Sequence, residues 1–263
     1  MYADYTTMPQ VGPVRSTRDQ FLQFALPQDA ILAHIGGSPY ARNLLALLDY
    51  DTIDGYYLGT SSYWFDVERS RPKPFGKLNE YCWFTDASLL WNGMERADVL
   101  TTGETWPLFQ FSSETAEPSQ EAYWIELRYS DLSVTSFDYG GEGEGGHIYY
   151  KNHNNAPHYD EDGSRLTYTN VIVLEANIGL KDDGMSSDVD LSGGTGWYFT
   201  AGGQQPLVWE KGAPQDRLKL TTPKGDPLYI QPGKSYIGIL PTGNADVIAV
   251  SPFTPQEAAQ PGE

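Results

Sequence analysis

The hydrophobic period changes near the middle of the chain, and this change limits the fold more than any other feature. In the first 112 residues, apolar runs alternate with segments whose apolar residues recur at helical spacing. Beyond residue 120 the period becomes two, so that residues 123, 125, 127 and 129 alternate with Trp124, Glu126 and Arg128. A chain with both patterns is expected to be α+β, with an N-terminal α/β domain and a C-terminal β-rich domain.

The boundary between the two parts is expected in the polar stretch 112–120, which has no apolar anchor. This gives an α/β domain over residues 1–112 and a β-rich domain over 113–263. Glycine, proline and aspartate turns separate the later strands, which predicts an antiparallel sheet or a barrel-like domain. The predicted strands cover residues 123–129, 133–139, 147–151, 170–175, 196–200, 207–211, 217–221, 236–240 and 246–250.

Strand and helix patterns alternate in the first half. The predicted order is a strand at 1–5, a helix at 16–26, a buried strand at 30–35, a helix from Pro39 and a third strand within 49–58. Helical crossovers between strands predict a partly parallel sheet. A further short helix is expected over 85–91, closed by Gly93.

A turn near the N-terminus presents arginines at the start of the first predicted helix. Arg15 and Arg18 flank Ser16, and Ser16 with Asp19 fits a capping box. A helix start offers free N–H groups and a positive dipole end, which together with guanidinium groups suit an anion. The alternative is a well-capped helix whose arginines pair with nearby carboxylates.

A second turn is expected to lie beside the first. Gly36 and Gly37 allow a sharp reversal, and Ser38 is a natural N-cap before Pro39. Both turns would follow the carboxyl ends of parallel strands, where α/β sheets bind ligands. His34 would face the same crevice as a weak catalytic candidate, or it is a hydrogen-bonded core histidine.

The long segment 59–77 is the third candidate region. It carries Tyr63, Trp64, Arg69 and Arg71, which suit a lid over a sugar or an anion. The alternative is a surface loop packed by its own aromatic side chains.

Composition excludes several classes of function. The formal net charge of −18 opposes binding to nucleic acid or to an anionic membrane surface. A single cysteine, Cys82, excludes an intrachain disulfide and any multi-cysteine metal site. Acidic clusters at 158–162 and 182–190 lack the spacing of a calcium loop. We expect no metal and no cofactor.

The chain resembles the YerB-like family of bacterial lipoproteins over nearly its whole length. The motifs that carry the resemblance are Gly12-Pro13-Val14-Arg15-Ser16-x-Arg18, Asp29-Ala30-x-x-Ala33-His34-x-Gly36-Gly37-Ser38-Pro39, His158, Asn170-Val171-Ile172-Val173, Asp188-Val189-Asp190-Leu191-x-Gly193, Gly196-x-Tyr198-Phe199, Trp209-x-Lys211 and Pro232-Gly233-Lys234-x-Tyr236.

This resemblance implies a two-domain α+β protein outside the cytoplasmic membrane, anchored through a lipidated cysteine upstream of Met1. Part of the first domain would also lie upstream. The family implies no established biochemical activity. Members usually carry a Pro-His-Asn segment after the third strand, and the corresponding region around Pro72–Phe75 has no histidine.

Three functions follow, in order of preference. The first is binding of an anionic small molecule or cell-wall component by Arg15, Ser16 and Arg18 with the Gly36-Gly37-Ser38 turn. The second is a scaffold that docks other envelope proteins, and the third is an enzyme acting on an envelope glycan or phosphodiester. The sequence contains no nucleophile elbow and no cysteine–histidine pair, which disfavours the enzyme.

Overall fold

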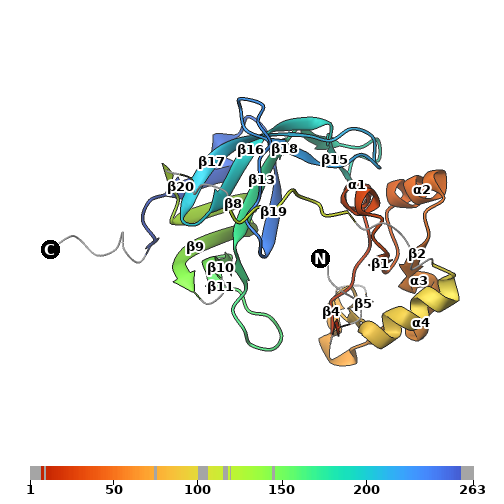
Figure 1. Cartoon of the computed structure of the whole chain (residues 1–263). Coiled ribbons are helices and arrows are strands. Elements are labelled where there is room, and N and C mark those ends of the chain that lie inside the picture. The colour runs from red at the N-terminus through yellow and green to blue at the C-terminus, as the bar shows by residue number, and fades with distance from the viewer. Residues whose placement is uncertain are drawn as a thin grey trace. The chain divides into compact units, whose positions relative to one another are not determined.

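A computed structural model describes residues 7–8, 10–73, 76–99, 106–114, 118, 120–143 and 146–255 (Figure 1). The predicted strand at 1–5 lies outside them. The chain divides into two compact units: unit 1 comprises residues 1–108 with 214–217, and unit 2 comprises 109–213 with 218–263. We describe each unit by itself. No helix among the described residues is long and apolar enough to cross a membrane.

A small parallel sheet organises unit 1. Strand β1 (Leu32–His34) pairs in parallel with β2 (Thr52–Asp54), and helix α2 (Pro39–Leu48) connects them. The parallel crossover predicted from the sequence is therefore present. The remaining elements of unit 1 are α1 (Asp19–Ala25), η2 (Leu26–Gln28), α3 (Gly55–Leu58), η3 (Gly59–Ser61), β3 (Trp64–Phe65), η4 (Val67–Arg69), β4 (Arg71–Lys73), β5 (Gly76–Leu78), β6 (Trp83–Phe84) and α4 (Ala87–Ala97).

The two predicted helix starts differ in outcome. At α2 the prediction is confirmed, because the Ser38 hydroxyl accepts a hydrogen bond from the Ala41 amide at 3.1 Å and Pro39 is the first helical residue. At α1 the capping box is absent: Arg18 is the N-cap residue and no side chain caps the helix. The Ser16 hydroxyl instead donates to the Ile35 carbonyl at 3.2 Å.

Two further predictions in unit 1 are wrong. Residues 56–58 were expected in the third strand but form α3, because the carboxylate of Asp54 accepts the Tyr56 amide at 2.9 Å and caps a helix there. Gly93 does not end α4 but lies buried inside it, since a Cβ at this position would meet Ile53 at 2.6 Å and Ser62 at 2.7 Å. Close packing, not termination, explains this glycine.

Two small hydrophobic clusters form the core of unit 1. One is centred on the fully buried Ile53 and Tyr63, with Leu90 and Met94 from α4 packed against them. The other joins α1 to α2 through Leu22, Leu26 and Ala41. These clusters hold the β1–β2 strand ends and the start of α2 in place.

Unit 2 is built from two open sheets, each with six strands. The first contains β8 (Trp124–Ser130), β9 (Ser133–Gly143), β10 (Gly146–His153), β11 (Ala156–Pro157), β12 (Thr167–Tyr168) and β20 (Ile248–Ser251). The second contains β7 (Gln120–Glu121), β13 (Asn170–Ala176), β16 (Gly193–Thr200), β17 (Gly203–Glu210), β18 (Lys219–Thr221) and β19 (Ser235–Pro241). A separate hairpin pairs β14 (Ile178–Leu180) with β15 (Ser187–Val189), and η5 (Ala245–Val247) precedes β20.

A strand overlaps each one predicted in the second half, and the α+β class is confirmed. The bounds differ in places, because β18 begins only at Lys219 and residues 246–247 belong to η5. The described strands do not close into the barrel that was one of the two expected forms. Strand β13 departs from an all-antiparallel sheet, because it pairs antiparallel with β16 but parallel with β19. Its residues are almost all buried, as expected for a central strand covered on both faces.

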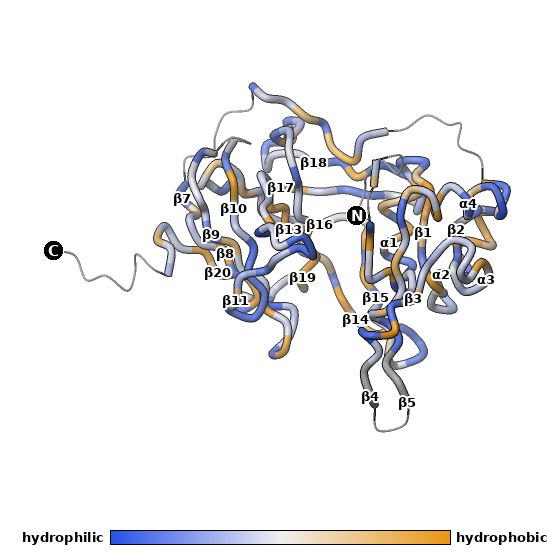
Figure 2. The backbone as a smooth tube through the Cα atoms, turned by 90° about the horizontal axis from the view of Figure 1, so that it is seen from below, coloured by the Kyte–Doolittle hydropathy of each residue, from blue (hydrophilic) through white to orange (hydrophobic). Residues whose placement is uncertain are grey.

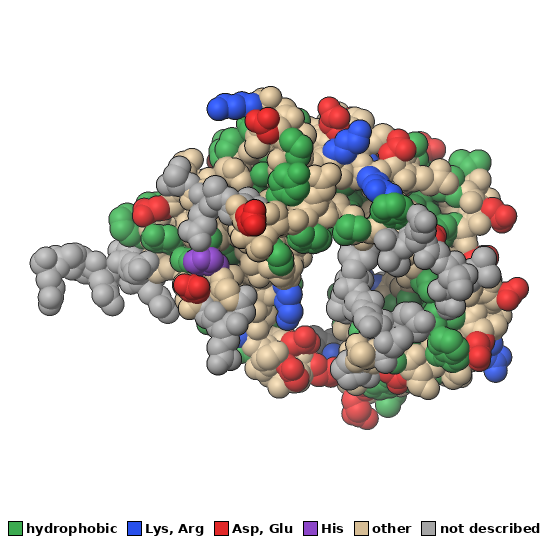
Figure 3. Space-filling view, viewed as in Figure 1, with side chains coloured by type: hydrophobic (Ala, Val, Ile, Leu, Met, Phe, Trp, Pro, Cys, Tyr) green, Lys and Arg blue, Asp and Glu red, His purple; other side chains and the backbone are tan. Residues whose placement is uncertain are grey.

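The core of unit 2 is larger than either core of unit 1. It combines Ile125, Leu127 and Phe137 of the first sheet with Val171 and Phe199 of the second. Figure 2 shows hydrophobic and hydrophilic stretches along the strands of unit 2. Acidic side chains lie scattered over the face seen in Figure 3, which fits a role of the negative charge in solubility.

Candidate functional site

The two predicted turns lie side by side in unit 1. The amide of Ile35 donates to the Arg15 carbonyl at 3.1 Å, and the amide of Thr17 donates to the Gly36 carbonyl at 3.0 Å. The amide of Ser38 returns a bond to the Thr17 carbonyl at 3.1 Å. We call residues 15–18 and 36–38 the double turn. It brings together six residues predicted to bind a ligand: Arg15, Ser16, Arg18, Gly36, Gly37 and Ser38.

Glycine is favoured at both positions of the second turn, for two different reasons. Gly36 has φ +68°, a left-handed conformation that other residues adopt only with strain. A Cβ on Gly37 would lie 3.2 Å from the methyl group of the buried Thr17, so a larger residue would push the two turns apart. The sequence therefore fixes the close approach of these segments locally.

The arginines of the double turn are exposed and have no carboxylate partner in the described part of the chain. The Arg15 guanidinium lies over the Tyr81 ring, 4.9 Å from its centroid. Nη1 of Arg18 donates to the Ser16 and Thr17 carbonyls at 3.2 and 2.9 Å. Stacking by its face leaves the in-plane N–H groups of a guanidinium available to an anion.

A third arginine, missed by the sequence analysis, lies at the same place. Nη2 of Arg42 and Oγ of Ser16 lie 3.7 and 3.6 Å from the position of a Cβ on Gly36, so both flank this glycine. The Arg42 guanidinium also lies over the Tyr56 ring at 5.4 Å. The signal was present in the spacing: Arg42 follows the N-cap Ser38 by four residues, which places both on one face of α2.

Asp54 connects the double turn to α3. One carboxylate oxygen accepts the Gly36 amide at 2.7 Å and the Tyr56 amide at 2.9 Å. The same oxygen lies 3.7 Å from Nδ1 of His34. Asp54 itself is nearly buried, so these bonds fix the conformation of the Gly36 turn.

His34 is a structural residue in this geometry. It is 3% exposed, with Nδ1 2.8 Å from the Gly36 carbonyl and Nε2 2.9 Å from the Thr52 hydroxyl. Because a carbonyl only accepts, Nδ1 carries a proton. Both ring nitrogens are engaged inside the protein, which agrees with a hydrogen-bonded core histidine and gives no support to a role as general acid or base.

Three of the four candidates from the long segment have described side chains, and these belong to the core of unit 1 or to a local aromatic cluster. Tyr63 is 0% exposed and donates its hydroxyl proton to the Ile53 carbonyl at 2.6 Å, and burial raises the pKa of this hydroxyl. A ring without an exposed face offers no surface for a sugar, so Tyr63 leaves the set of ligand-binding candidates.

Two of the other three candidates of that segment, Trp64 and Arg69, have local contacts. Trp64 stacks on Phe84, with ring centroids 4.9 Å apart. Arg69 pairs with Asp66 at 3.2 Å and lies over the same phenylalanine ring. Arg71 begins β4, whose side chains lie outside the described part. Trp64 and Arg69 both pack on Phe84, which lies outside the segment 59–77, so the segment is not packed by its own aromatic residues alone.

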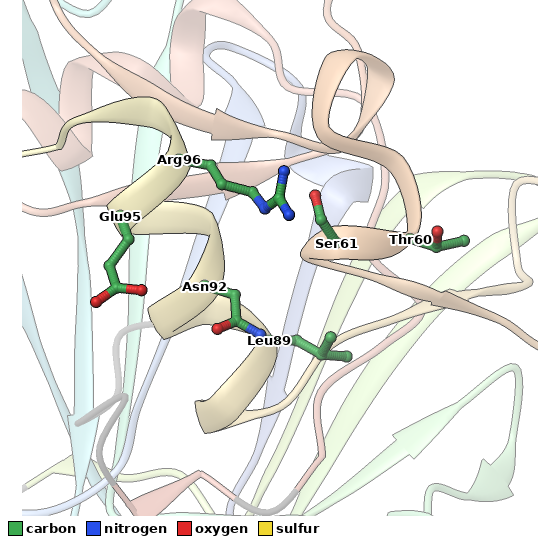
Figure 4. Close-up of a pocket in the computed structure, with 6 residues that line it drawn as sticks. All are labelled: Thr60, Ser61, Leu89, Asn92, Glu95 and Arg96. Carbon is green, nitrogen blue, oxygen red and sulfur yellow. The ribbon is translucent and has the colours of Figure 1, made fainter.

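An open hollow of about 450 Å³ lies between η3 and α4 in unit 1. Its lining residues are Thr60, Ser61, Leu89, Asn92, Glu95 and Arg96. Figure 4 shows Arg96 pointing toward Ser61 across the hollow, while Glu95 points away. No pattern in the sequence singled out these residues.

Unit 2 contains a lysine–histidine pair of its own. Nζ of the buried Lys151 lies 2.8 Å from Nδ1 of His158, and the His153 ring lies 6.0 Å from the His158 ring. Burial lowers the pKa of both groups, and for His158 the nearby charges of Lys151 and His153 lower the pKa further, against the opposing effect of Asp160.

The acidic turns of unit 2 use their carboxylates locally. Asp183 accepts the amides of Met185 and Ser186 at 2.9 and 2.7 Å, and Asp162 accepts the Ser164 amide at 2.8 Å. These bonds are those of tight turns with an aspartate at the first position. Among the described residues, no group of three histidine, cysteine or acidic side chains is arranged to hold a metal ion.

Comparison with known proteins places the chain in a family. Residues 1–99 match the N-terminal domain of a protein of unknown function, DUF3048, and residues 125–237 match the C-terminal domain of the same family. The chain belongs to the DUF3048 family, as the motifs of both halves predicted.

A relative and a solved structure cover most of the chain. The chain is 29% identical over 249 residues to the Bacillus subtilis (strain 168) protein named "Putative lipoprotein YerB", covering 92% of this chain and 70% of the relative. The crystal structure of YerB protein from Bacillus subtilis matches with a TM-score of 0.76 and 26% identity, over 93% of this chain and 78% of that one. The chain therefore shares its fold with the Bacillus subtilis YerB protein.

Proposed function

We propose that the protein is an extracytoplasmic cell-envelope lipoprotein that binds a phosphate or carboxylate group at the double turn. The first half of this proposal follows from the relative, which is named a lipoprotein. Fatty-acid labelling of the native gene product in its own cells tests it. Incorporation of label and recovery with membranes are expected, and an unlabelled protein outside the membrane fraction would contradict the anchor.

Anion binding at the double turn is inferred from the exposure of Arg15 and Arg18 and from their lack of a carboxylate partner in the described part of the chain. The chain has 35 acidic residues against 17 basic ones, so surface arginines have many available carboxylates. Arg15 and Arg18 are nevertheless exposed without a carboxylate partner in the described part. By contrast, Arg128 in unit 2 pairs with Glu126 at 3.0 Å. Unpaired, positioned guanidinium groups are the usual means of holding a phosphate or carboxylate.

Local geometry supports the same conclusion. The double turn is preformed, because two backbone bonds join its turns, a third runs from Ile35 to Arg15, and Asp54 accepts the Gly36 amide. A preformed site loses less conformational entropy on binding. Arg42 adds a third positive charge next to Gly36 without any new backbone element.

Thermal unfolding with inorganic phosphate tests the proposal. At about a hundred times its dissociation constant, a specific ligand adds about 2.7 kcal/mol to the free energy of unfolding. We expect stabilisation of the natural chain and its loss in the double variant Arg15→Ala, Arg18→Ala. The control variant Arg128→Ala removes a partly exposed arginine that already has a carboxylate partner, and it should keep the effect.

Two results would overturn the binding site. One is equal stabilisation of the natural chain and the double variant by phosphate, which would assign the effect to nonspecific ion binding. The other is no stabilisation by phosphate, or by the multivalent carboxylate citrate, at any ligand concentration up to about 100 mM. In the second case, a role in docking other envelope proteins becomes the better interpretation.

A further inference from the structure

Two adjacent tyrosines next to the double turn are unusually exposed. Tyr56 is 66% exposed and Tyr57 is 75% exposed, and both belong to α3. Their rings meet edge to face with centroids 5.1 Å apart. Large aromatic side chains on the surface contribute to binding more often than to folding, because their apolar faces gain from leaving water.

The tyrosine pair is tied to the arginines by contacts within unit 1. Asp54 accepts the amides of Gly36 and Tyr56 with one oxygen, so the glycine turn and the start of α3 are held by the same carboxylate. Arg42 completes the connection, since its guanidinium lies over the Tyr56 ring and next to Gly36. The aromatic surface and the positive charge therefore form one continuous patch.

The two tyrosine rings differ in their contacts and in their exposure. Tyr56 is held by Arg42 on its face and by Tyr57 at the pair contact. Tyr57 is the more exposed ring, and in the described part its ring contact is with Tyr56. An aromatic ring fixed by a neighbour offers a flat apolar face at a small cost in conformational entropy.

We propose that the double turn binds a sugar that carries a phosphate or carboxylate, with the sugar ring stacked on Tyr57 and the anionic group held by Arg42 and the double turn. This inference rests on the proposed anion binding and names the class of its ligand. The C–H face of a pyranose ring is apolar, which suits the face of Tyr57, while a substituent of negative charge suits Arg42.

Isothermal titration calorimetry with four probes tests the inference: glucose 1-phosphate, glucuronate, inorganic phosphate and glucose. We expect glucose 1-phosphate or glucuronate to bind about tenfold more tightly than inorganic phosphate, which corresponds to about 1.4 kcal/mol of stacking. Glucose alone should bind more weakly than either charged sugar. The preferred charged sugar then identifies the anionic group.

Variants separate the contribution of the ring from that of the charge. Tyr57→Ala should remove the tenfold preference and leave the affinity for inorganic phosphate unchanged, whereas Tyr57→Phe should keep the preference because it keeps the ring. Arg42→Ala should weaken the charged sugars and phosphate alike. Tyr229→Ala in unit 2 removes another exposed tyrosine and should change nothing.

The outcomes distinguish the two proposals. Phosphate binding that depends on Arg15 and Arg18, together with equal affinity of the natural chain and Tyr57→Ala for both charged sugars, overturns the sugar site and keeps the anion site. Absence of binding by all four probes overturns both. Self-association of the natural chain that Tyr57→Ala abolishes, measured by sedimentation without any probe, would assign the tyrosines to an interface between copies and overturn the sugar site.

Discussion

The two units of this protein treat their charged and aromatic residues differently. In unit 2, large rings such as Trp209 and Tyr198 are fully buried and hydrogen-bonded, and the turn carboxylates accept backbone amides. In unit 1, arginines of the double turn are exposed without a described carboxylate partner, and Tyr56 and Tyr57 face solvent. We propose that this contrast reflects stability in unit 2 and ligand binding at the double turn of unit 1.

The test with the largest expected effect is a substitution in the core of unit 2. Trp209 is fully buried and its indole N–H donates to the Thr195 and Glu175 carbonyls at 2.9 and 3.2 Å. Trp209→Ala should lower the free energy of unfolding by about 3–5 kcal/mol, because it leaves a cavity and unpaired carbonyls. Urea unfolding measures the loss. A change below about 1 kcal/mol would contradict the central role given to this ring.

A second variant breaks the support of the double turn. Asp54→Ala removes the acceptor of the Gly36 and Tyr56 amides and should cost about 3 kcal/mol. It should also weaken phosphate binding, since the glycine turn loses its anchor. Asp86→Ala is a matched control, because Asp86 caps α4 through a single bond to Leu89 and should cost about 1 kcal/mol without affecting binding. Equal effects of the two variants on binding would contradict the role of Asp54.

A third comparison lies within the double turn. Ser38 caps α2, so Ser38→Ala should cost about 1 kcal/mol of stability. The exposed Ser16 makes one bond to the Ile35 carbonyl, so Ser16→Ala should change stability by less than about 0.5 kcal/mol. Because Ser16 flanks Gly36, the Ser16→Ala substitution should weaken phosphate binding instead. Chemical denaturation and phosphate titration of both variants measure the two effects, and a reversed order would contradict these assignments.

The smallest expected effect concerns the titration of His158 in unit 2. Its pKa lies below the ordinary value of 6.5 because of burial and the neighbouring charges of Lys151 and His153. A lowered histidine pKa means that its contribution to stability is complete above pH 6.5 and decreases as the pH falls below it. Lys151→Met should raise the His158 pKa, as measured by proton NMR titration. An unchanged or lower pKa in this variant would contradict the influence of the lysine charge.

Sequence patterns predicted the fold of this protein well where hydrophobic period decided the outcome. Strands such as β13 and β19 followed from short β-rich runs bounded by turn residues, and the α2 start followed from Ser38-Pro39. The parallel pairing of these two strands was not predictable, because a long connection leaves no local signal.

Two errors in unit 1 have different physical causes. Tyr56 and Tyr57 have the aromatic character of strand residues, yet Asp54 is a favourable N-cap residue and its carboxylate starts a helix there. Serine is a favoured N-cap residue, but the Ser16 hydroxyl donates to the Ile35 carbonyl of the neighbouring segment and does not cap α1. At Ser16, therefore, a contact between distant segments overrides the local pattern, whereas at Asp54 one local signal overrides another.

The candidate site was predicted in part. The pattern of the two turns indicated Arg15, Ser16 and the glycines, and these residues lie together. Tyr63 was chosen for its aromatic character, although burial removes its face, and Arg42 was missed because its role depends on how α2 meets the first turn. Exposure and proximity are properties of the folded chain, which explains both errors.

The most direct test of anion binding at the double turn is a two-dimensional proton–nitrogen NMR titration with inorganic phosphate. The account predicts saturable shifts of the Gly36 and Gly37 amides and of the Nε–H groups of Arg15, Arg18 and Arg42, with unit 2 amides unchanged. Saturable shifts confined to Thr60, Ser61 and Arg96 around the open hollow, or no shifts at all, would contradict it.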